Sequence, residues 1–331
     1  MDGCRWLVTG GCGFIGAALI GELLRRDPDV CVRVLDDLSV GKPGAIGLDG
    51  SDAATPEDVA SGGWAPGIRL ARGDIRDAAA CRAACEGADV IVHLAANTGV
   101  APSVADPMMD CLTNVVGTLN MLEAARSGGV PRFVMASSGA PAGEVTPPIH
   151  EEMAPRPVSP YGASKLAGEG YCSAYARTFG IDTVALRFGN VYGPGSGHKT
   201  SVVAQFCGAV IEGRPVRIFG AGTQTRDFIY LGDLLDALFA AAETPDIGGE
   251  IFQIASAKET TVNELADAFA AVVESRGHAV VGIEREPPRQ GDVLRNFSDT
   301  RKARERLGWT PRTSLEDGLA RTFDWFVAHA D

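Results

Sequence analysis

The stretch Trp6-Leu7-Val8-Thr9-Gly10-Gly11-Cys12-Gly13-Phe14-Ile15-Gly16 decides the fold of this chain. A short apolar run leads into a loop with glycines at its first, fourth and seventh positions, and residues 17–24 continue as an amphipathic helix. Glycines there permit a tight turn and let backbone N–H groups and the helix N-terminus approach a pyrophosphate. Because strand, loop and helix follow in this order, the stretch predicts a Rossmann-type dinucleotide-binding unit.

A second expected strand, residues 31–36, ends in the acid Asp36, about 20 residues after the glycine loop. A carboxylate at this point accepts hydrogen bonds from the adenosine ribose hydroxyls and repels a 2′-phosphate. Asp36 therefore predicts NAD as the cofactor instead of NADP. The alternative is an acid that only ends a strand at the surface.

Strands and helices alternate along the rest of the chain. Strands are expected at residues 68–70, 90–94, 132–136, 183–188 and 250–255, and helices at residues 108–127, 160–178, 232–243, 262–276 and 300–307. This alternation predicts an α/β fold, a doubly wound parallel sheet with helices on both faces. Residues 41–66, rich in Gly, Ala, Asp and Pro, predict a surface excursion between strands.

The length of 331 residues accommodates two units. We expect an NAD-binding Rossmann domain from residues 1–187 and 225–256, and a smaller α/β substrate-binding domain from residues 188–224 and 257–331. The net charge of −12 argues against nucleic acid and an anionic membrane surface as partners. Eight cysteines without paired metal spacing predict reduced thiols, a cytoplasmic location and no metal site. No segment approaches the length of a membrane span.

Tyr161 and Lys165 lie four residues apart in an expected helix, which places both side chains on one face. An ammonium beside a phenol favours the phenolate, so we expect the pKa of Tyr161 to fall below its usual value of about 10. The spacing thus predicts Tyr161 as a general base near neutral pH. The alternative is an exposed helical pair without a function.

Further motifs extend over nearly the whole chain. They are Thr9 to Gly16, Arg72-Gly73-Asp74-Ile75-Arg76-Asp77, His93-Leu94-Ala95-Ala96, Asn114 in Asn-Val-Val-Gly-Thr, Ser137-Ser138, Tyr161 to Lys165, Leu186 to Pro194, Thr225 to Tyr230, and Arg289-Gln290-Gly291-Asp292. Together they resemble the extended short-chain dehydrogenases/reductases, and specifically the NAD-dependent nucleotide-sugar epimerase/dehydratase family.

The resemblance implies roles for individual residues. It assigns cofactor contacts to Gly10, Gly13, Phe14, Ile15, Gly16, Asp36, Asp74, Ile75, Leu94, Ala95, Ala96, Asn114, Tyr161 and Lys165. It assigns catalysis to Ser138, Tyr161 and Lys165, and substrate contacts to Ser137, Ser138, Asn190, Arg226, Arg289 and Asn296. Arginine offers a fixed fork of donors that suits phosphate oxygens. Alternatively, Arg289 is a surface charge, and Arg226 pairs with Asp227 or Asp233.

The residues after Ser138 distinguish the reactions of the family. By the resemblance, 4,6-dehydratases need an acid and a base where this chain has Gly139 and Ala140, uronate decarboxylases carry Glu at the second position, and the reductases carry Cys. An epimerase needs only the Ser, the Tyr, the Lys and a tightly held NAD. By subtraction the chain is expected to be a 4-epimerase that inverts C4 of a UDP-sugar through a transient 4-keto sugar.

Departures from the family pattern bear on the substrate, a UDP-hexose or UDP-hexuronate. Pro141-Ala142 replaces a common Val-Tyr, and Asn296 falls where some epimerases carry Tyr. His198 and Lys199 offer positive charge to a uronate, so the UDP-glucuronate/galacturonate pair is slightly favoured over UDP-glucose/galactose and the N-acetylhexosamines. The alternatives are an NAD-dependent oxidoreductase that releases a keto product and a non-catalytic dinucleotide-binding module. We also expect a homodimer packed through residues 108–127 and 160–178.

Overall fold

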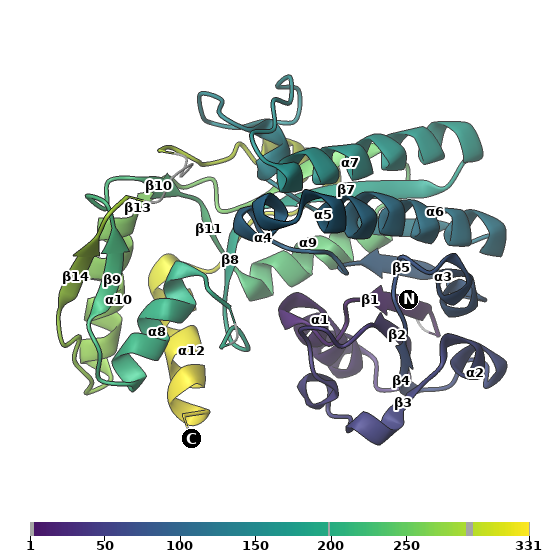
Figure 1. Ribbon diagram of the computed structural model, residues 1–331, viewed down its shortest axis with the longest axis horizontal. Coiled ribbons are helices and arrows are strands. Elements are labelled where there is room, and N and C mark those ends of the chain that lie inside the picture. Colours follow the sequence, from purple (N-terminus) through teal and green to yellow (C-terminus); the bar gives the residue numbers. More distant parts are fainter. Residues whose placement is uncertain (1–2, 198, 289–293, 331) are drawn as a thin grey trace. The chain divides into compact units, whose positions relative to one another are not determined.

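The computed structural model describes residues 3–197, 199–288 and 294–330 (Figure 1). Its main feature is an eight-stranded sheet in the order β12-β7-β6-β5-β1-β2-β4-β3. The strands are β1 (Arg5–Thr9), β2 (Cys31–Asp36), β3 (Ala53–Ala54), β4 (Gly67–Arg72), β5 (Val90–His93), β6 (Arg132–Ser138), β7 (Asp182–Phe188) and β12 (Glu250–Ile254). β1 pairs in parallel with both β2 and β5, so the strand order reverses beside β1. Open sheets bind ligands at the carboxyl ends of their strands where the order reverses.

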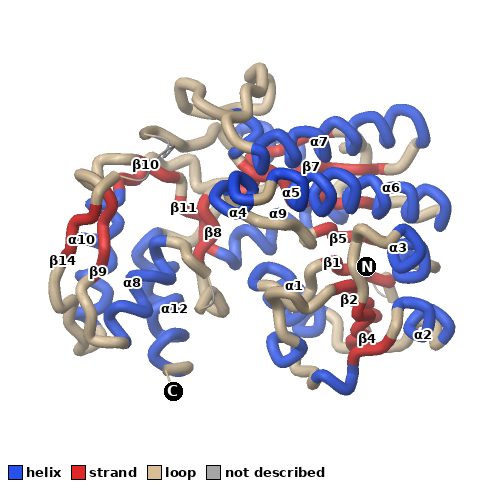
Figure 2. The backbone as a smooth tube through the Cα atoms, viewed as in Figure 1, coloured by secondary structure: helices blue, strands red, loops and turns tan. Residues whose placement is uncertain are grey.

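Helices cover both faces of this sheet, as Figure 2 shows in blue and red. They are α1 (Phe14–Arg26), α2 (Pro56–Ser61), α3 (Ala78–Cys85), α4 (Val100–Ala105), α5 (Pro107–Cys111), α6 (Gly117–Gly128), α7 (Pro160–Phe179) and α9 (Leu231–Glu243). Leu7 of β1 packs in a buried cluster with residues of α3, α6 and α7. Its neighbour Trp6 points to the other face, where its ring lies 5.9 Å from that of Phe239 on α9. The alternation along β1 therefore confirms the expected doubly wound arrangement.

Two expectations about local structure need correction. Residues 41–66 are more than a surface excursion, because they contain two short 3₁₀ turns, the edge strand β3 and helix α2, whose Val59 is buried in the sheet core. The helix expected at 108–127 is interrupted by a π-helical turn at Leu112–Val116, between α5 and α6. Such turns are rare and often occur at functional sites. The other expected elements are present with ends shifted by a few residues.

A second compact unit consists of residues 144–153, 188–237 and 253–331. It contains β8 (Asn190–Tyr192), β9 (Val216–Phe219), β10 (Thr225–Arg226), β11 (Phe228–Tyr230), β13 (Thr260–Thr261), β14 (Ile283–Glu286), α8 (Val202–Ile211), α10 (Val262–Ser275), α11 (Arg301–Leu307) and α12 (Leu315–Ala328). Its core is aromatic: the ring of Phe269 lies 5.7 Å from Phe206 and 5.9 Å from Phe323. The assignment of cofactor binding to one unit and sugar binding to the other stays a prediction.

Two properties of the chain concern its surroundings. All eight cysteines are free thiols. A search of the described residues for a helix with the length and hydropathy of a membrane span found no such helix.

Candidate active site

The glycine loop between β1 and α1 leaves no space for side chains. Gly10 has φ +67°, and a Cβ added to it would lie 2.8 Å from the backbone N of Ala95. A Cβ on Gly16 would lie 2.4 Å from the carbonyl oxygen of Gly10. Gly13 precedes the first turn of α1 and offers no side chain to cap it. The N–H groups of the first turn of α1 thus remain available for a ligand such as a dinucleotide pyrophosphate. Phe14 and Ile15 belong to that turn.

Asp36 ends β2 and is only 7% exposed, so the alternative of a surface acid is wrong. Its carboxylate accepts hydrogen bonds from the backbone N of Cys12 and of Leu38, both at 2.9 Å. Burial raises the pKa of Asp36. Since a carboxylate has about four lone-pair sites, two of them remain for ribose hydroxyls. The residues present therefore fit an NAD molecule: the glycine loop would hold its pyrophosphate and Asp36 its adenosine ribose.

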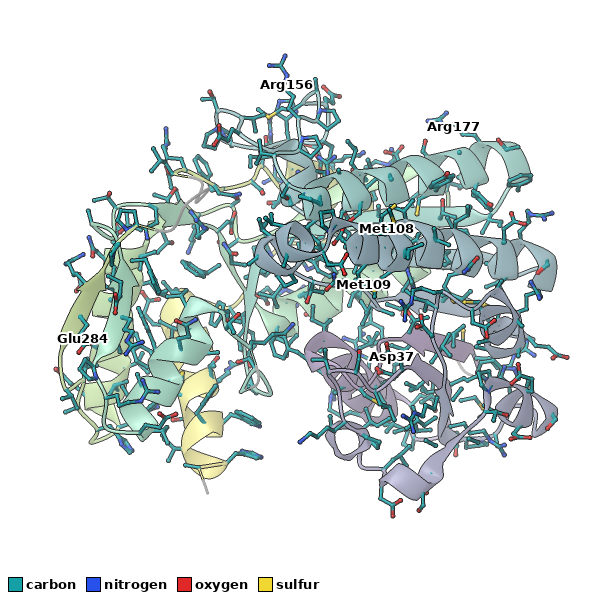
Figure 3. The ribbon with its side chains drawn as sticks, in the orientation of Figure 1. Asp37, Met108, Met109, Arg156, Arg177 and Glu284 are labelled. Carbon is teal, nitrogen blue, oxygen red and sulfur yellow. The ribbon has the colours of Figure 1, made fainter. Side chains whose placement is uncertain are left out.

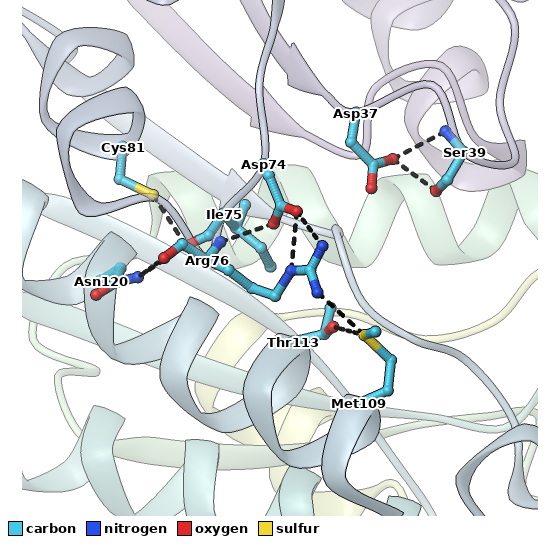
Figure 4. A network of polar contacts seen from close by, with 9 residues as sticks. All are labelled: Asp37, Ser39, Asp74, Ile75, Arg76, Cys81, Met109, Thr113 and Asn120. Carbon is cyan, nitrogen blue, oxygen red and sulfur yellow. Dashed lines mark hydrogen bonds and ion pairs between the residues drawn. The ribbon is translucent and has the colours of Figure 1, made fainter. Parts of the chain in front are cut away.

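Asp74 and Ile75, two of the expected cofactor contacts, follow β4 (Figure 4). Asp74 forms an ion pair with Arg76, and that guanidinium lowers the pKa of the carboxyl group. The carbonyl oxygen of Ile75 accepts a bond from Asn120 Nδ2 at 3.0 Å. Arg76 also approaches the sulfur of Met109 on α5. This network fixes the loop after β4, at the carboxyl edge of the sheet.

A buried chain of hydrogen bonds holds the loop after β5. The hydroxyl of Thr118 donates to the carbonyl oxygen of Asn114 at 2.6 Å, so it accepts from Nε2 of His93 at 3.1 Å. Nδ1 of His93 then accepts from Thr9 Oγ1 at 2.8 Å, and Thr9 accepts from the backbone N of Ala95 at 3.1 Å. Burial lowers the pKa of His93 to about 3, in agreement with this neutral tautomer. This series of hydrogen bonds holds Ala95 against the glycine loop, together with its neighbours Leu94 and Ala96.

The three predicted catalytic side chains lie together. Ser138 ends β6, and its hydroxyl is hydrogen-bonded to Tyr161. Tyr161 occupies the first turn of α7, which Pro160 begins and which Ser159 caps by accepting from the backbone N of Gly162 at 3.1 Å. Lys165 is 4% exposed, and its Nζ lies 5.9 Å from the centre of the Tyr161 ring. The alternative of an exposed helical pair is therefore wrong.

The expected effect of Lys165 on Tyr161 needs correction. Nζ of Lys165 donates to the carbonyl oxygen of Ala136 at 2.9 Å and is directed at the backbone of β6. Burial raises the pKa of Tyr161 to about 12, against a lowering by the bond from Ser138. Burial also lowers the pKa of Lys165 to about 8. In this geometry desolvation of Tyr161 outweighs the hydrogen bond from Ser138, and Lys165 is not among the groups that lower the pKa of Tyr161.

A buried ion pair next to the predicted catalytic residues was not predicted from the sequence. Glu169 lies one turn after Lys165, and Arg187 of β7 donates to it with Nε and Nη2, both at 2.7 Å. The hydroxyl of Ser137 donates to Oε1 of Glu169 at 2.6 Å. Any substrate contact by Ser137 has to compete with this bond. The sequence signal was the spacing from Lys165 to Glu169, because residues four apart share a helix face.

Of the predicted substrate residues, Ser137 and Ser138 belong to the first unit, and Asn190, Arg226 and Asn296 belong to the second. Asn190 and Arg226 line a cavity of about 240 Å³, together with Tyr192, Phe219 and residues of α8. The backbone N of Asn296 donates to Thr225 Oγ1 at 3.2 Å, beside Arg226 in the chain. Arg289, Asp292 and His198 lie outside the described residues. The roles of all these residues in substrate binding stay predictions.

Two acids named as alternative partners of Arg226 bind elsewhere. Asp227 accepts from the backbone N of Ser256 and of Ser298, and Asp233 accepts from the backbone N of Thr313. Both carboxylates therefore serve to connect segments of the second unit.

Comparisons with known proteins agree with this geometry. The sequence profile of the NAD dependent epimerase/dehydratase family matches residues 6–255. The UDP-glucose 4-epimerase of Mycolicibacterium smegmatis is 37% identical over 97% of this chain and 98% of its own length. The dTDP-glucose 4,6-dehydratase of Streptomyces griseus is 32% identical over 98% and 94%. The crystal structure of UDP-glucose 4-epimerase from Thermotoga maritima with UDP-glucose has a TM-score of 0.85 and 33% identity, covering 99% of this chain and 100% of that one.

The chain belongs to the NAD dependent epimerase/dehydratase family. The predicted family, the Rossmann-type fold, the NAD cofactor and an epimerase-type enzyme that binds a nucleotide sugar are thereby confirmed. The relatives include both an epimerase and a dehydratase, so the site residues have to decide between these reactions.

Proposed function

We propose that this chain is an NAD-dependent UDP-sugar 4-epimerase. The observation that carries the proposal is the pairing of Ser138 with Tyr161 at the end of β6, directly followed by Gly139 and Ala140. Neither of these two residues can donate or accept a proton through its side chain, which elimination of water from a sugar requires. The chain therefore has the side chains for reversible oxidation at C4 of the sugar. At Gly139 and Ala140 it lacks the acid and the base that dehydration requires.

The proposed roles follow from the hydrogen bonds. Ser138 holds the sugar O4 and connects it to the hydroxyl of Tyr161. Tyr161 removes the O4 proton as the C4 hydride departs, and returns it when hydride is added to the other face of the sugar. Tyr161 accepts this proton as the phenolate, so its phenol must first lose a proton to solvent, a step that burial opposes. When bound, NAD supplies the reversible acceptor for that hydride. Lys165 would hold the nicotinamide ribose when NAD is bound.

A rotating keto sugar must stay attached through its diphosphate. Asn190 and Arg226 line the 240 Å³ cavity of the second unit, which supports their role as diphosphate or nucleoside contacts. We propose that binding energy is concentrated on the UDP portion, because tight contacts to the hexose would oppose its rotation. The NAD would remain bound between turnovers, because no net oxidation occurs.

The test of the reaction is incubation of purified protein with UDP-glucose, UDP-glucuronate and UDP-N-acetylglucosamine, without added NAD, followed by NMR of the C4 epimers. A new C4 epimer without NADH supports the proposal and names the substrate. Stoichiometric NADH with a stable keto sugar would favour the oxidoreductase alternative. Cofactor binding without turnover of any nucleotide sugar would favour the non-catalytic module.

The proton-transfer role has its own test in Tyr161→Phe. We expect this variant to bind NAD normally and to lose about 10²–10⁴-fold in kcat, the range for a positioned acid/base. Tyr171→Phe is the matched control, since Tyr171 lies on the same helix and is 37% exposed. Equal activity of both variants would contradict the role of Tyr161.

The sugar remains to be assigned among three C4 pairs. We propose to compare UDP-glucuronate/galacturonate with UDP-glucose/galactose and the N-acetylhexosamines, since Lys199 is half-buried and its ammonium carries a charge suited to a uronate. Burial lowers the pKa of Lys199, which limits that charge at high pH. If Lys199→Ala leaves uronate turnover unchanged while the glucose pair is also turned over, the uronate preference is wrong.

We also propose a homodimer in the cytoplasm, where eight free thiols would stay reduced. Val104, Met108, Leu112 and Val116 recur every fourth residue and are exposed by 61, 66, 40 and 38% (Met108 is labelled in Figure 3). Val104 belongs to α4, whereas Met108, Leu112 and Val116 follow one another through α5 and the π-helical turn, and these exposed apolar residues support packing against a second helix pair. Sedimentation should give a dimer at micromolar concentration and a monomer for Met108→Glu. Val40→Glu, at another exposed apolar residue, is the control.

A further inference from the structure

Asp110 on α5 is a buried acid that the proposed mechanism does not use. It is 1% exposed, its Oδ1 accepts from Nδ2 of Asn114 at 2.9 Å, and its Oδ2 has no hydrogen-bond partner in the described part of the chain. Burying a carboxylate with an unsatisfied oxygen is costly, so its presence needs a physical explanation.

Hydrogen bonds connect Asp110 to the helix that carries the catalytic pair. Nδ2 of Asn114, which binds Asp110, also lies 3.2 Å from Ser164 Oγ. Ser164 Oγ in turn donates to the carbonyl oxygen of Tyr161 at 3.0 Å, and the next residue is Lys165. Asp110 and the first two turns of α7 are therefore held together through two side chains, those of Asn114 and Ser164.

The other ionisable groups near Lys165 are neutral or already paired. Glu169 on α7 binds Arg187 of β7 through two bonds of 2.7 Å, so the two charges compensate each other. His93 of β5 is neutral at pH 7, because its pKa is lowered to about 3. Cys172 on α7 is a neutral thiol, because burial raises its pKa to about 12. Asp110 is left as the buried acid that an arginine does not compensate.

We propose that Asp110 is a positioning residue for the epimerisation, whose buried negative charge balances the Lys165 ammonium and sets the pH at which the Tyr161–Lys165 pair gives up its first proton. This proposal rests on the proposed function, because it assigns a proton-transfer role to that pair.

The sign of the effect does not depend on which member of the pair loses the proton. The charge of Asp110 raises the pKa of Tyr161, and it also raises the pKa of Lys165, which burial lowers. A negative charge opposes every loss of a proton nearby. Removing the charge of Asp110 should therefore lower the first pKa of the Tyr161–Lys165 pair, whichever of the two residues loses that proton.

The decisive variant is Asp110→Asn, which keeps the shape and an oxygen that can accept from Asn114. We expect the acid limb of its kcat/KM profile to move to lower pH by roughly one unit, the size of a neighbouring-charge effect. Asp106→Asn is the matched control, since Asp106 is an exposed acid one turn earlier that caps α5 through the backbone N of Met109. Asn also caps helices, so this control should leave the profile unchanged. An unshifted acid limb in Asp110→Asn would overturn the proposal.

A measurement without turnover separates this inference from the proposed reaction. NMR of protein with labelled lysine, with the Lys165 signal assigned by its absence in Lys165→Met, should show a titration midpoint near 8 that falls by roughly one unit in Asp110→Asn. If Asp110→Ala shows the same shift of the Lys165 midpoint, the cause is the lost charge and not the lost hydrogen bond with Asn114. An unmoved midpoint overturns the role of Asp110 even if epimerisation is intact. A moved midpoint in a protein without epimerase activity supports Asp110 and contradicts the function.

Discussion

Asp36 and Asp227 are similar acids in the two compact units. Asp36 ends β2 in the first unit, and Asp227 lies between β10 and β11 in the second. They are 7% and 1% exposed, and burial raises the pKa of both. A pattern search on the sequence alone would treat both as buried acids beside a strand.

The number of internal donors distinguishes them. Asp36 accepts two hydrogen bonds, from the backbone N of Cys12 and of Leu38. Asp227 accepts four, from the backbone N and Oγ of Ser256 at 2.6 Å and from the backbone N of Ala257 and of Ser298 at 3.1 Å. Because a carboxylate has about four lone-pair sites, Asp36 retains capacity for a ligand and Asp227 has none left. We infer that Asp36 binds a ligand and that Asp227 stabilises the fold.

The largest expected effect is the loss of stability in Asp227→Ala. Three backbone N–H groups, those of Ser256, Ala257 and Ser298, would lose their acceptor. We expect a loss of roughly 3 kcal/mol in the free energy of unfolding, measured by denaturant titration. Asp37→Ala is the control, because Asp37 is exposed and, among the described residues, accepts hydrogen bonds only from Ser39, so it should change stability by less than about 0.5 kcal/mol. A similar small change in both variants would refute the structural role of Asp227.

The second expected effect is on cofactor affinity in Asp36→Ala. If Asp36 binds the adenosine ribose as predicted, removing its carboxylate would delete those hydrogen bonds, and bonds to a charged group contribute roughly 1.5–3 kcal/mol. The Kd for NAD, measured by calorimetry on protein stripped of cofactor, should rise about 10–100-fold. Asp37→Ala again serves as control and should bind NAD as the wild type does. An unchanged Kd in Asp36→Ala would show that the two free lone-pair sites do not serve the ligand.

The sequence predicted the parts of the molecule that depend on local geometry. Gly10 and Gly16 were identified because glycines permit a tight turn and a close backbone approach, and the structure shows a left-handed φ at Gly10 and no space for a Cβ at either residue. Tyr161 and Lys165 were identified because helical spacing places them on one face. Such features need only a few neighbouring residues, so a motif contains nearly all the information.

The sequence did not predict what depends on contacts across the sheet and its helices. Asp110 acquires its role through Asn114, which contacts Ser164 50 positions further along the chain, and Glu169 acquires its role from Arg187, 18 positions away. The raised pKa of Tyr161 follows from desolvation, which burial in the folded chain determines. Burial and donor counts are properties of the packed structure, and no spacing rule encodes them.

A smaller effect should appear in the cofactor preference of Asp36→Asn. The backbone N–H groups of Cys12 and Leu38 bind different oxygens of Asp36, so the amide keeps the acceptor for one of them and removes the negative charge that repels a 2′-phosphate. We expect the ratio of the Kd values for NADP and NAD to fall by about tenfold. The ratio should not change in Asp227→Asn, whose carboxylate faces only protein donors. A ratio unchanged in Asp36→Asn would indicate that loop shape, and not charge, excludes NADP.

The smallest expected effect is a pH dependence of stability that the two acids share. Burial raises the folded-state pKa of Asp227 above its unfolded value of about 3.9, so the native state binds more protons between these two values. Stability conferred by Asp227 is therefore full below the lower value and falls as pH rises through the window, by about 1.4 kcal/mol per unit of pKa difference. The stability advantage of the wild type over Asp227→Asn should then shrink with rising pH, and Asp36 against Asp36→Asn should behave in the same direction. The contrary result would be a stability advantage of the wild type that grows with pH for Asp227 alone. That result would mean that its four hydrogen bonds lower its pKa by more than burial raises it. The two acids would then differ in the sign of their pKa shift as well as in the number of their donors.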